Sequence, residues 1–328
     1  MRKSVKRVLG LVLTAVLAIG LCACGGEKTG SKVYKIGVTQ FADHPSLQNC
    51  YDGFVEGLKQ EGFVAGENIE IESQSAKTDM AVASQIAQNF ANSGKDLVCG
   101  IATPSAQTLY SACYDKGIPV VFNAVSDPVI AKLAKSETEA MDGISGVSDR
   151  LPVEDQLKLI RAILPDAKKI GILYTTGEEN SVSTIKVYKE LASKYGFEIV
   201  EKGVGNQAEI PQAADILLEQ VDCISNMTDN TVVAALPVIL EKANAKKIPV
   251  FGSEVEQVSN GCVACAGLDY FRLGIQAGKI AARVLKGEDI SSIPYETITE
   301  SSVSVNKSVA EKLGVTIPDD ILSKADVK

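Results

Sequence analysis

The sequence predicts an α/β protein with two doubly wound lobes, each built on a parallel sheet, joined by a multi-strand hinge. Beyond residue 32, short β-rich runs alternate with segments of helical periodicity, which is the pattern of parallel sheets flanked by helices. The series also repeats: KIG at 35–37 is echoed by KIG at 169–171, and IPVV at 118–121 by IPVF at 248–251. The 328 residues are enough for two domains of ordinary size.

The first repeat begins with a predicted strand at 33–39. The helix after it has apolar side chains every three or four residues and ends at Gly62. A second strand is predicted at 69–73, ahead of another amphipathic helix. The runs at 96–101 and 118–124 are continuously apolar, as in parallel strands buried on both faces.

Segments that connect the two repeats predict the hinge. GISGVS at 143–148 leads into the second repeat, and GCVACAG at 261–267 precedes a long helix at 270–287. A chain that crosses from one lobe to the other and back suits two lobes that close on a small ligand. We expect an N-terminal lobe of residues 33–145 plus about 262–290, and a C-terminal lobe of 146–261 plus about 291–328.

The first segment predicts export. Residues 1–7 carry four positive charges and residues 8–24 carry none, as in a signal sequence. Leu21-Cys22-Ala23-Cys24, followed by two glycines, resembles the lipobox of bacterial lipoproteins, whose last cysteine carries diacylglycerol. That resemblance implies a signal peptide at 1–23, lipidation of Cys24 and a lipidated tether at 24–32; an uncleaved membrane anchor is the alternative. Loss of the leader changes the net charge from −8 to −12.

Composition and missing motifs argue against several functions. The 41 acidic residues outnumber 33 Lys and Arg, so a broad nucleic-acid surface is not expected. The sequence has no GxSxG, GxxxxGK[ST], HExxH or GxGxxG motif. We therefore predict no catalytic residue, no cofactor and no metal site. A hydrolase that uses His44, the one histidine, stays as a remote alternative without supporting spacing.

Six cysteines remain after Cys22 and Cys24. Cys99 and Cys223 fall in corresponding strands of different lobes. Cys262 and Cys265 are three residues apart in a predicted strand, about 10 Å in extended chain and beyond the roughly 7 Å limit for a disulfide. A turn at that point would make their bridge possible, whereas a single CxxC is too small for a zinc site. We predict that most of the six are buried free thiols.

Loops that follow the predicted strands are the expected binding site, because ligands of doubly wound sheets lie beyond the carboxyl ends of the strands. A helix N-terminus at Thr103 would favour a carboxylate. Acidic residues could hold an ammonium group, and aromatic ones a flat apolar wall. Helix capping is the alternative role for any one loop. The expected ligand-binding residues are Gln40, Phe41, His44, Thr103, Ser105, Ala106, Ser126, Asp127, Ser148, Asp149, Asn180, Ser181, Thr228, Asp229, Asn230, Glu254 and Asp269.

Several stretches together resemble a known family, the ABC transporter substrate-binding lipoproteins that include tryptophan- and tyrosine-binding receptors of Gram-positive bacteria. They are the lipobox, KIGVTQFADHPSL, GIATPSAQ, IPVVFNAVSDP, GISGVSD, KKIGILY, IPVFGSE and GLDYFRLGIQAGKIAARVL. The resemblance implies a type I periplasmic-binding fold, no enzymatic activity, and delivery of a captured solute to a membrane permease driven by a separate ATPase. It also implies an extracytoplasmic protein that touches the membrane through its lipid anchor only, and we expect a monomer.

In similar proteins, Ser and Thr hydroxyls and helix N-termini hold the amino-acid backbone, and an acid holds the amine. By that likeness the favoured contacts are Ser105, Ser126, Ser148, Asn180, Thr228 and Asn230, followed by Asp229 or Glu254, with an aromatic wall of Phe41, Phe122 and Tyr174. The expected function is capture of a small zwitterion, an aromatic amino acid (Trp, Tyr or Phe), between the lobes. A sensor or receptor for another solute, such as a sugar, a nucleoside or another amino acid, is the alternative.

Overall fold

The computed structural model describes residues 32–298 and 300–328, and residues 34–328 form one unit. The expected signal peptide, Cys24 and all but the last residue of the tether lie outside the described residues. Within the described part of the chain, no helix combines the length and the apolar character that a membrane crossing needs.

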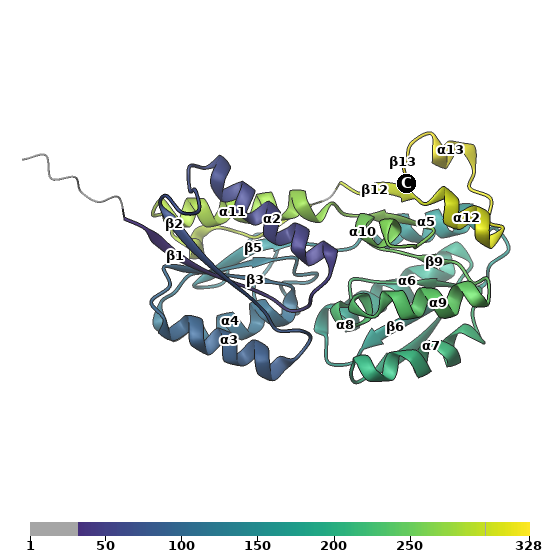
Figure 1. The fold of residues 1–328 in the computed structure, drawn as a ribbon, viewed down its shortest axis with the longest axis horizontal. Helices are drawn as coiled ribbons and strands as arrows, with labels where there is room; N and C mark the ends of the chain where they lie inside the picture. Colours follow the sequence, from purple (N-terminus) through teal and green to yellow (C-terminus); the bar gives the residue numbers. More distant parts are fainter. Residues whose placement is uncertain (1–31, 299) are drawn as a thin grey trace, which may run out of the picture. The chain divides into compact units, whose positions relative to one another are not determined.

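The sheet of the first lobe has parallel strands in the order β11-β5-β4-β3-β1-β2 (Figure 1). The central strands are buried along their whole length, as their continuous apolar runs predict. Gln40 pairs with Ile101 and Ile101 with Asn123, so these strands end at the same edge. The strands are β1 (Tyr34–Gln40), β2 (Ile69–Ser75), β3 (Leu97–Ile101), β4 (Val120–Asn123), β5 (Ile144–Ser148) and β11 (Glu296–Thr297).

Two pairs of helices cover this sheet. Figure 1 shows α3 (Met80–Asn92) and α4 (Thr103–Cys113) on one face, and α2 (Pro45–Gln60) and α11 (Tyr270–Leu285) on the other. Pro at the first turn of α2 suits a helix start, since its missing N–H would have no partner there. The apolar stripe of α2 faces the core, including Leu47 and Phe54, which are almost completely buried.

Helices α2 and α11 run side by side in close contact through glycines. Gly53 and Gly57 of α2 meet Gly274 and Gly278 of α11 in parallel register. A Cβ at Gly57 would stand 2.2 Å from the carbonyl oxygen of Ile275, which leaves no room for a side chain. Because the helices are parallel, their N-terminal ends lie together at the same end of the pair.

The second lobe has parallel strands in the order β7-β6-β8-β9. Strand β10 lies beside β9, since Val263 N–H donates to Val250 O and Gly252 N–H to Ala264 O. Strands β12 and β13 follow β10, with β12 antiparallel to it. The strands are β6 (Lys169–Thr175), β7 (Glu198–Val204), β8 (Cys223–Ser225), β9 (Val250–Phe251), β10 (Ala264–Gly267), β12 (Ser302–Val305) and β13 (Asp326–Val327).

The remaining helices belong to the second lobe. They are α5 (Val153–Ile163), α6 (Glu179–Ala192), α7 (Ile210–Leu218), α8 (Asn230–Ala234), α9 (Leu236–Ala245), α10 (Val255–Ser259), α12 (Lys307–Leu313) and α13 (Asp319–Leu322). Short 3₁₀ turns occur at Tyr114–Lys116, Ser193–Tyr195, Gln207–Glu209 and Ile290–Ser292.

The two-lobed α/β fold with parallel sheets is confirmed. The chain crosses between the sheets after β5, between β10 and α11, and between β11 and β12. Three strands depart from the expected divisions: β5 runs past residue 145 within the first-lobe sheet, β11 also joins that sheet, and β10 forms a three-stranded sheet with β12 and β13 beside the second-lobe sheet. Local pattern does not show which sheet a short apolar strand joins, so the detailed lobe boundaries stay a prediction.

All six cysteines within the described residues are buried and none of these six is in a disulfide, so their predicted burial is confirmed. Cys99 and Cys223 lie in β3 and β8, in different sheets. Burial raises the pKa of Cys113 to about 11, which lowers the fraction of reactive thiolate at neutral pH.

We expect six free thiols per chain when residues 25–328 are denatured without reductant, and slow labelling of the folded protein. Titration with a thiol reagent measures both. Finding one free thiol or none would contradict the prediction.

Candidate functional site

A small cavity lies where loops from the two lobes meet. Its free volume is roughly 10 Å³. The first lobe contributes the β1–α2 loop, the start of α4, the loops after β4 and β5, and the start of α11. The second contributes the start of α6 and the loops after β8 and β9. The lining residues are His44, Leu47, Ala102, Thr103, Ala124, Ser126, Asp149, Asn180, Thr228, Asn230, Glu254 and Tyr270.

Every polar residue of this lining except Tyr270 was expected from the sequence, but none of the apolar ones was. Leu47, Ala102, Ala124 and Tyr270 were not among the expected residues. Tyr270 stands at the start of α11, beside the expected Asp269, because the close α2–α11 contact carries that helix end to the cavity. No local motif marks it as a binding residue.

Two buried carboxylates face the cavity without a cation. Asp149 follows β5 and accepts hydrogen bonds from Ser126 Oγ (2.9 Å) and from the Tyr270 hydroxyl. Glu254 follows β9 and accepts one from Ser46 Oγ. Burial raises the pKa of Asp149, and raises that of Glu254 to about 8. With that pKa Glu254 is mainly protonated at pH 7 in the absence of a ligand. No Lys or Arg lines the cavity, so a positively charged ligand group would favour the ionised form of both carboxyl groups.

The start of α4 offers hydrogen-bond donors that suit a negatively charged group. The hydroxyls of Thr103 and Ser105 are buried and have no hydrogen-bond partner among the described residues. The first N–H groups of a helix have no partner within the helix, and they favour a negative charge. Ala102, just before α4, has a φ of 75°, which turns the chain sharply from β3 into the helix. Leaving a buried polar group unpaired costs about 1–3 kcal/mol, so these hydroxyls suit a ligand acceptor.

Glu178 organises the second-lobe side. Its carboxylate accepts hydrogen bonds from the backbone and side chains of Asn230 and Thr231 at the start of α8. It also accepts one from Asn180 Nδ2 at 3.3 Å. Burial and the charge of Asp229 raise the pKa of Glu178 to about 7. Glu178 therefore orients Asn180 and Asn230. The sequence does not predict this role, because a Glu in a polar run before a helix is common at the protein surface.

Asp229 and Ser181 support the same loops from outside the cavity. Asp229 is the N-cap of α8 and accepts from Val232 N–H (2.9 Å). It also accepts from Thr175 N–H (2.6 Å) and Ser181 Oγ (2.7 Å). The side chains of Asp229 and Ser181 are thus hydrogen-bonded within the protein and do not face the cavity.

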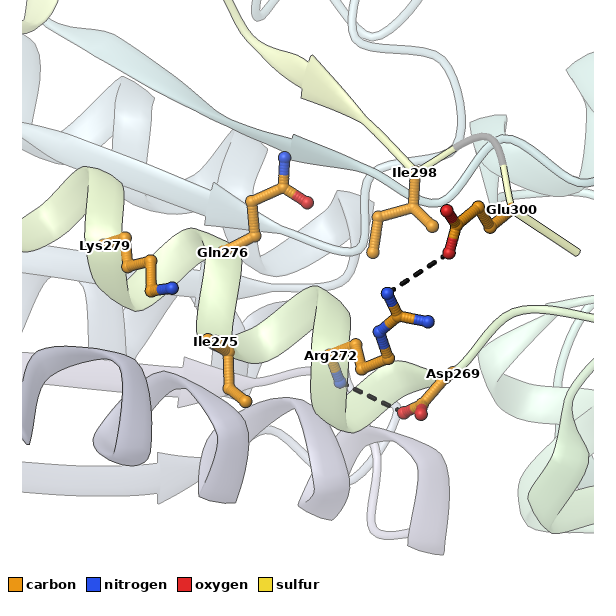
Figure 2. Close-up of a pocket in the computed structure, with 7 residues that line it drawn as sticks. All are labelled: Asp269, Arg272, Ile275, Gln276, Lys279, Ile298 and Glu300. Carbon is orange, nitrogen blue, oxygen red and sulfur yellow. Dashed lines mark hydrogen bonds and ion pairs between the residues drawn. The ribbon is translucent and has the colours of Figure 1, made fainter. Parts of the chain in front are cut away.

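Asp269 caps α11, accepting from the N–H groups of Phe271 and Arg272. Figure 2 shows it at one end of a larger cavity, of roughly 390 Å³, along α11 and the segment after β11. There Arg272 pairs with Glu300 at 3.2 Å. Lys279 also lines this cavity, which shares no lining residue with the cavity between the lobes.

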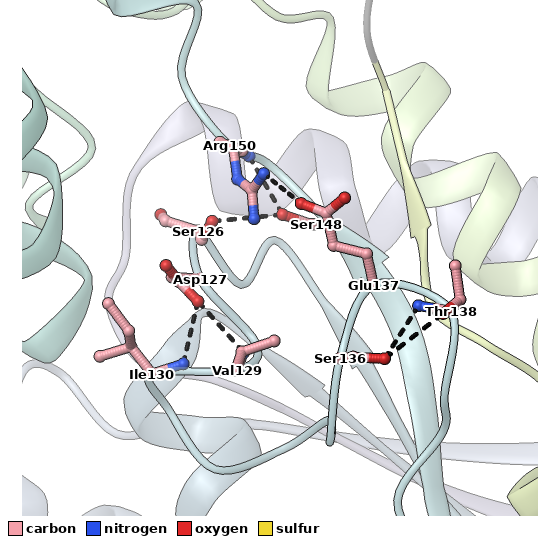
Figure 3. Close-up of polar contacts among 9 residues, drawn as sticks. All are labelled: Ser126, Asp127, Val129, Ile130, Ser136, Glu137, Thr138, Ser148 and Arg150. Carbon is pink, nitrogen blue, oxygen red and sulfur yellow. Dashed lines mark hydrogen bonds and ion pairs between the residues drawn. The ribbon is translucent and has the colours of Figure 1, made fainter.

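Asp127 and Ser148 lie in a polar cluster next to the cavity (Figure 3). Asp127 accepts from the N–H groups of Val129 and Ile130 and so holds a turn. Ser148 Oγ donates to the Ser126 carbonyl and accepts from Arg150 N–H. Both residues support the loops that present Ser126 and Asp149.

The other expected residues lie outside the cavity. Gln40 Nε2 donates to Asp43 at 3.4 Å, and Ala106 is buried with its backbone against Gly100. The aromatic wall expected from Phe41, Phe122 and Tyr174 does not line the cavity, because those rings pack in the cores of their own lobes.

Contacts outside the cavity also join the lobes. Asn49 Nδ2 of α2 donates to Glu256 Oε1 of α10 at 2.6 Å. Gln107 Nε2 of α4 donates to Glu179 Oε2 of α6 at 3.1 Å. The structure therefore has its two lobes in direct polar contact around the cavity.

Comparisons with known proteins agree with this architecture. Residues 35–328 match the family model for ABC transporter substrate binding proteins. A tyrosine-binding protein of Clostridioides difficile (strain R20291) is 38% identical over 320 residues, covering 94% of this chain and 92% of the relative.

Two solved structures have similar coverage, each spanning 90% of this chain and 99% of their own. A domain from Streptococcus pneumoniae in complex with L-Trp is 33% identical, with a TM-score of 0.87. A substrate-binding protein with adhesive properties from Clostridium difficile, in a ligand-free, open structure, is 38% identical, with a TM-score of 0.68. The resemblance found in the sequence is confirmed. The chain belongs to the ABC transporter substrate-binding proteins.

Proposed function

We propose that this protein captures an aromatic amino acid, Trp, Tyr or Phe, in the cavity between its lobes and delivers it to an ABC permease. The observation that carries the proposal is the pair of buried carboxylates, Asp149 and Glu254, which face the cavity with no cation beside them. The start of α4 supplies the complementary end. An acidic end and a helix N-terminus around one cavity suit a zwitterion, and the named relatives support an aromatic one.

In this proposal the ligand's ammonium group lies between Asp149 and Glu254, and the free Oδ1 of Asn180 accepts from it. The ligand's carboxylate lies at the first turn of α4, where Thr103, which lines the cavity, donates; Ser105 lies behind it and does not line the cavity. Thr228 and Asn230 complete the second-lobe side, on loops that Glu178 holds in place. No reaction is assigned to these residues, and the family is a binding component of transporters, not a family of enzymes.

The arrangement of the lobes supports a closed, binding-competent form. The chain superposes more closely on the relative in complex with L-Trp than on the relative solved ligand-free and open, with TM-scores of 0.87 and 0.68. The polar contacts between the lobes agree with closure.

Substrate-binding proteins of ABC transporters work outside the cytoplasm. We infer that this one is a monomer, held at the outer face of the membrane by lipid on Cys24. Its partners are then the ligand, a permease and the ATPase that drives the permease. A hydrolase built on His44 has no support, since neither ring nitrogen of His44 has a hydrogen-bond partner among the described residues.

A thermal-shift panel of amino acids, sugars and nucleosides on residues 25–328 tests the proposal. Tyr, Trp or Phe is expected to stabilise the protein, by about 2.7 kcal/mol at a hundredfold excess over Kd. No shift with any of the three would overturn the aromatic ligand, and a shift with a sugar instead would replace it.

Asn49→Ala is expected to weaken binding of that ligand by roughly tenfold, although Asn49 does not line the cavity. The variant loses a hydrogen bond to a carboxylate that joins the lobes, and apparent affinity falls with the population of the closed form. Calorimetry measures the Kd of each variant, and stopped-flow fluorescence measures the dissociation rate of the ligand. Gln48→Ala, which removes an exposed contact within α2, is the matched control. Equal affinities would contradict the prediction.

A further inference from the structure

A second cavity shares His44 with the ligand cavity. It has a free volume of roughly 280 Å³ and lies between the β1–α2 loop of the first lobe and helices α8 to α10 of the second. Its second-lobe wall is mainly apolar and includes Val233, Leu236, Pro237 and Leu240. The side chain of His44 therefore stands at the boundary between a polar space and a larger apolar one.

The imidazole of His44 is buried beside the side chain of Asn230. It is 8% exposed, and neither ring nitrogen has a hydrogen bond of good geometry among the described residues. His44 is the N-cap of α2, yet its side chain makes no capping hydrogen bond. Burial lowers its pKa to about 4, although Asn230 and the charge of Asp43 act to raise it, so the ring is neutral at pH 7.

The ligand cavity by itself is small for an aromatic amino acid. Its free volume of roughly 10 Å³ lies far below the range of about 300–1,000 Å³ that is usual for ligand pockets. Its polar groups match the charged end of an amino acid, which leaves the large side chain without a place. The apolar second cavity has the room and the surface that such a side chain needs.

We propose that the side chain of the bound amino acid passes His44 and lies in this second cavity, which makes His44 a specificity-determining residue. The inference rests on the proposed function. The ring of His44 turns aside and packs flat against the side chain of the ligand. The ligands that this arrangement selects are α-amino acids with a large apolar or aromatic side chain, because small ones leave the apolar wall unfilled.

Filling the second cavity tests the proposal. Ala234 lines it and is half-buried, so Ala234→Trp inserts a ring into the space. Ala245→Trp, at an exposed site on α9, is the matched control. We expect Ala234→Trp to raise the Kd for Tyr or Trp at least tenfold relative to the control, with an unchanged melting temperature of the ligand-free protein. His44→Trp, which blocks the passage from the other side, should have the same effect.

Unchanged Kd in Ala234→Trp would overturn the proposal while the proposed function stands. Val187 lines a third cavity, which adjoins Ser126, and Val187→Trp tests whether the ligand's side chain lies there instead. If Val187→Trp weakens binding and Ala234→Trp does not, the side chain lies past Ser126 and the proposal is overturned. If the wild-type protein binds no aromatic amino acid, the proposed function itself fails.

Discussion

Asp149→Asn is expected to weaken binding of the aromatic amino acid by between about thirtyfold and several thousandfold. The exchange keeps the shape of the side chain and an acceptor for the Tyr270 hydroxyl, but it removes the buried negative charge that faces the ammonium group. Loss of one partner of a buried charge pair costs about 2–5 kcal/mol, and each 1.4 kcal/mol is tenfold in affinity. Calorimetric titration of the variant with the ligand measures the loss.

The same exchange should leave the ligand-free protein equally or more stable. Asp149 is 3% exposed and no cation lines its cavity, so burial of its charge costs free energy that the neutral amide does not. The melting temperature without ligand is thus expected to hold or rise while affinity falls. Asp52→Asn, an exposed acid on α2, is the control and should change neither quantity. Near wild-type affinity in Asp149→Asn would contradict the role given to this carboxylate.

Gly57→Val is expected to lower the free energy of unfolding by about 3 kcal/mol or more. A Cβ at this position would lie 2.2 Å from the carbonyl oxygen of Ile275, an atom of the α11 backbone that cannot swing aside. Overpacking in a core costs about 1–3 kcal/mol and occasionally more, and a clash with backbone falls at the upper end. Urea unfolding followed by circular dichroism measures the change.

Ligand binding should also weaken in Gly57→Val, because the α2–α11 contact holds the starts of both helices, and with them His44 and Tyr270, at the cavity. Gly177→Ala is the control, since its added Cβ meets no atom within 4 Å and its change in stability should stay within about 0.5 kcal/mol. Equal unfolding free energies for the two variants would show that the helices can separate without cost.

Much of the fold could be predicted from local pattern. The strand predicted at 33–39 overlaps all of β1 except its last residue, Gln40. The apolar runs at 96–101 and 118–124 contain β3 and β4, because a strand buried on both faces needs an unbroken apolar run. The close contact between the glycines of α2 and α11 could not be predicted from local pattern. Each glycine is needed only because another helix, more than 200 residues away in the chain, packs against it.

The loops around the cavity and many of its polar side chains were predicted, but other expected side chains in the same loops do not line the cavity. Thr103, Asp149 and Glu254 line the cavity as expected, whereas Asp229 and Asp269 are N-caps of helices. In sequence these acids look alike: each follows a strand, where a carboxylate can cap the next helix or face a ligand. The predicted aromatic wall does not line the cavity either, because an aromatic ring near the end of a strand can pack into the core instead.

The sequence by itself therefore determined the two α/β lobes, the family and the edge of the sheets where the candidate cavity lies, because apolar period, repeat and motif are all local or short-range properties. Only the tertiary structure decided which polar side chains face the cavity, that two carboxylates share it without a cation, and that His44 stands between two spaces. Those facts depend on which side chains from distant segments meet, and on which hydrogen bonds they leave unmade.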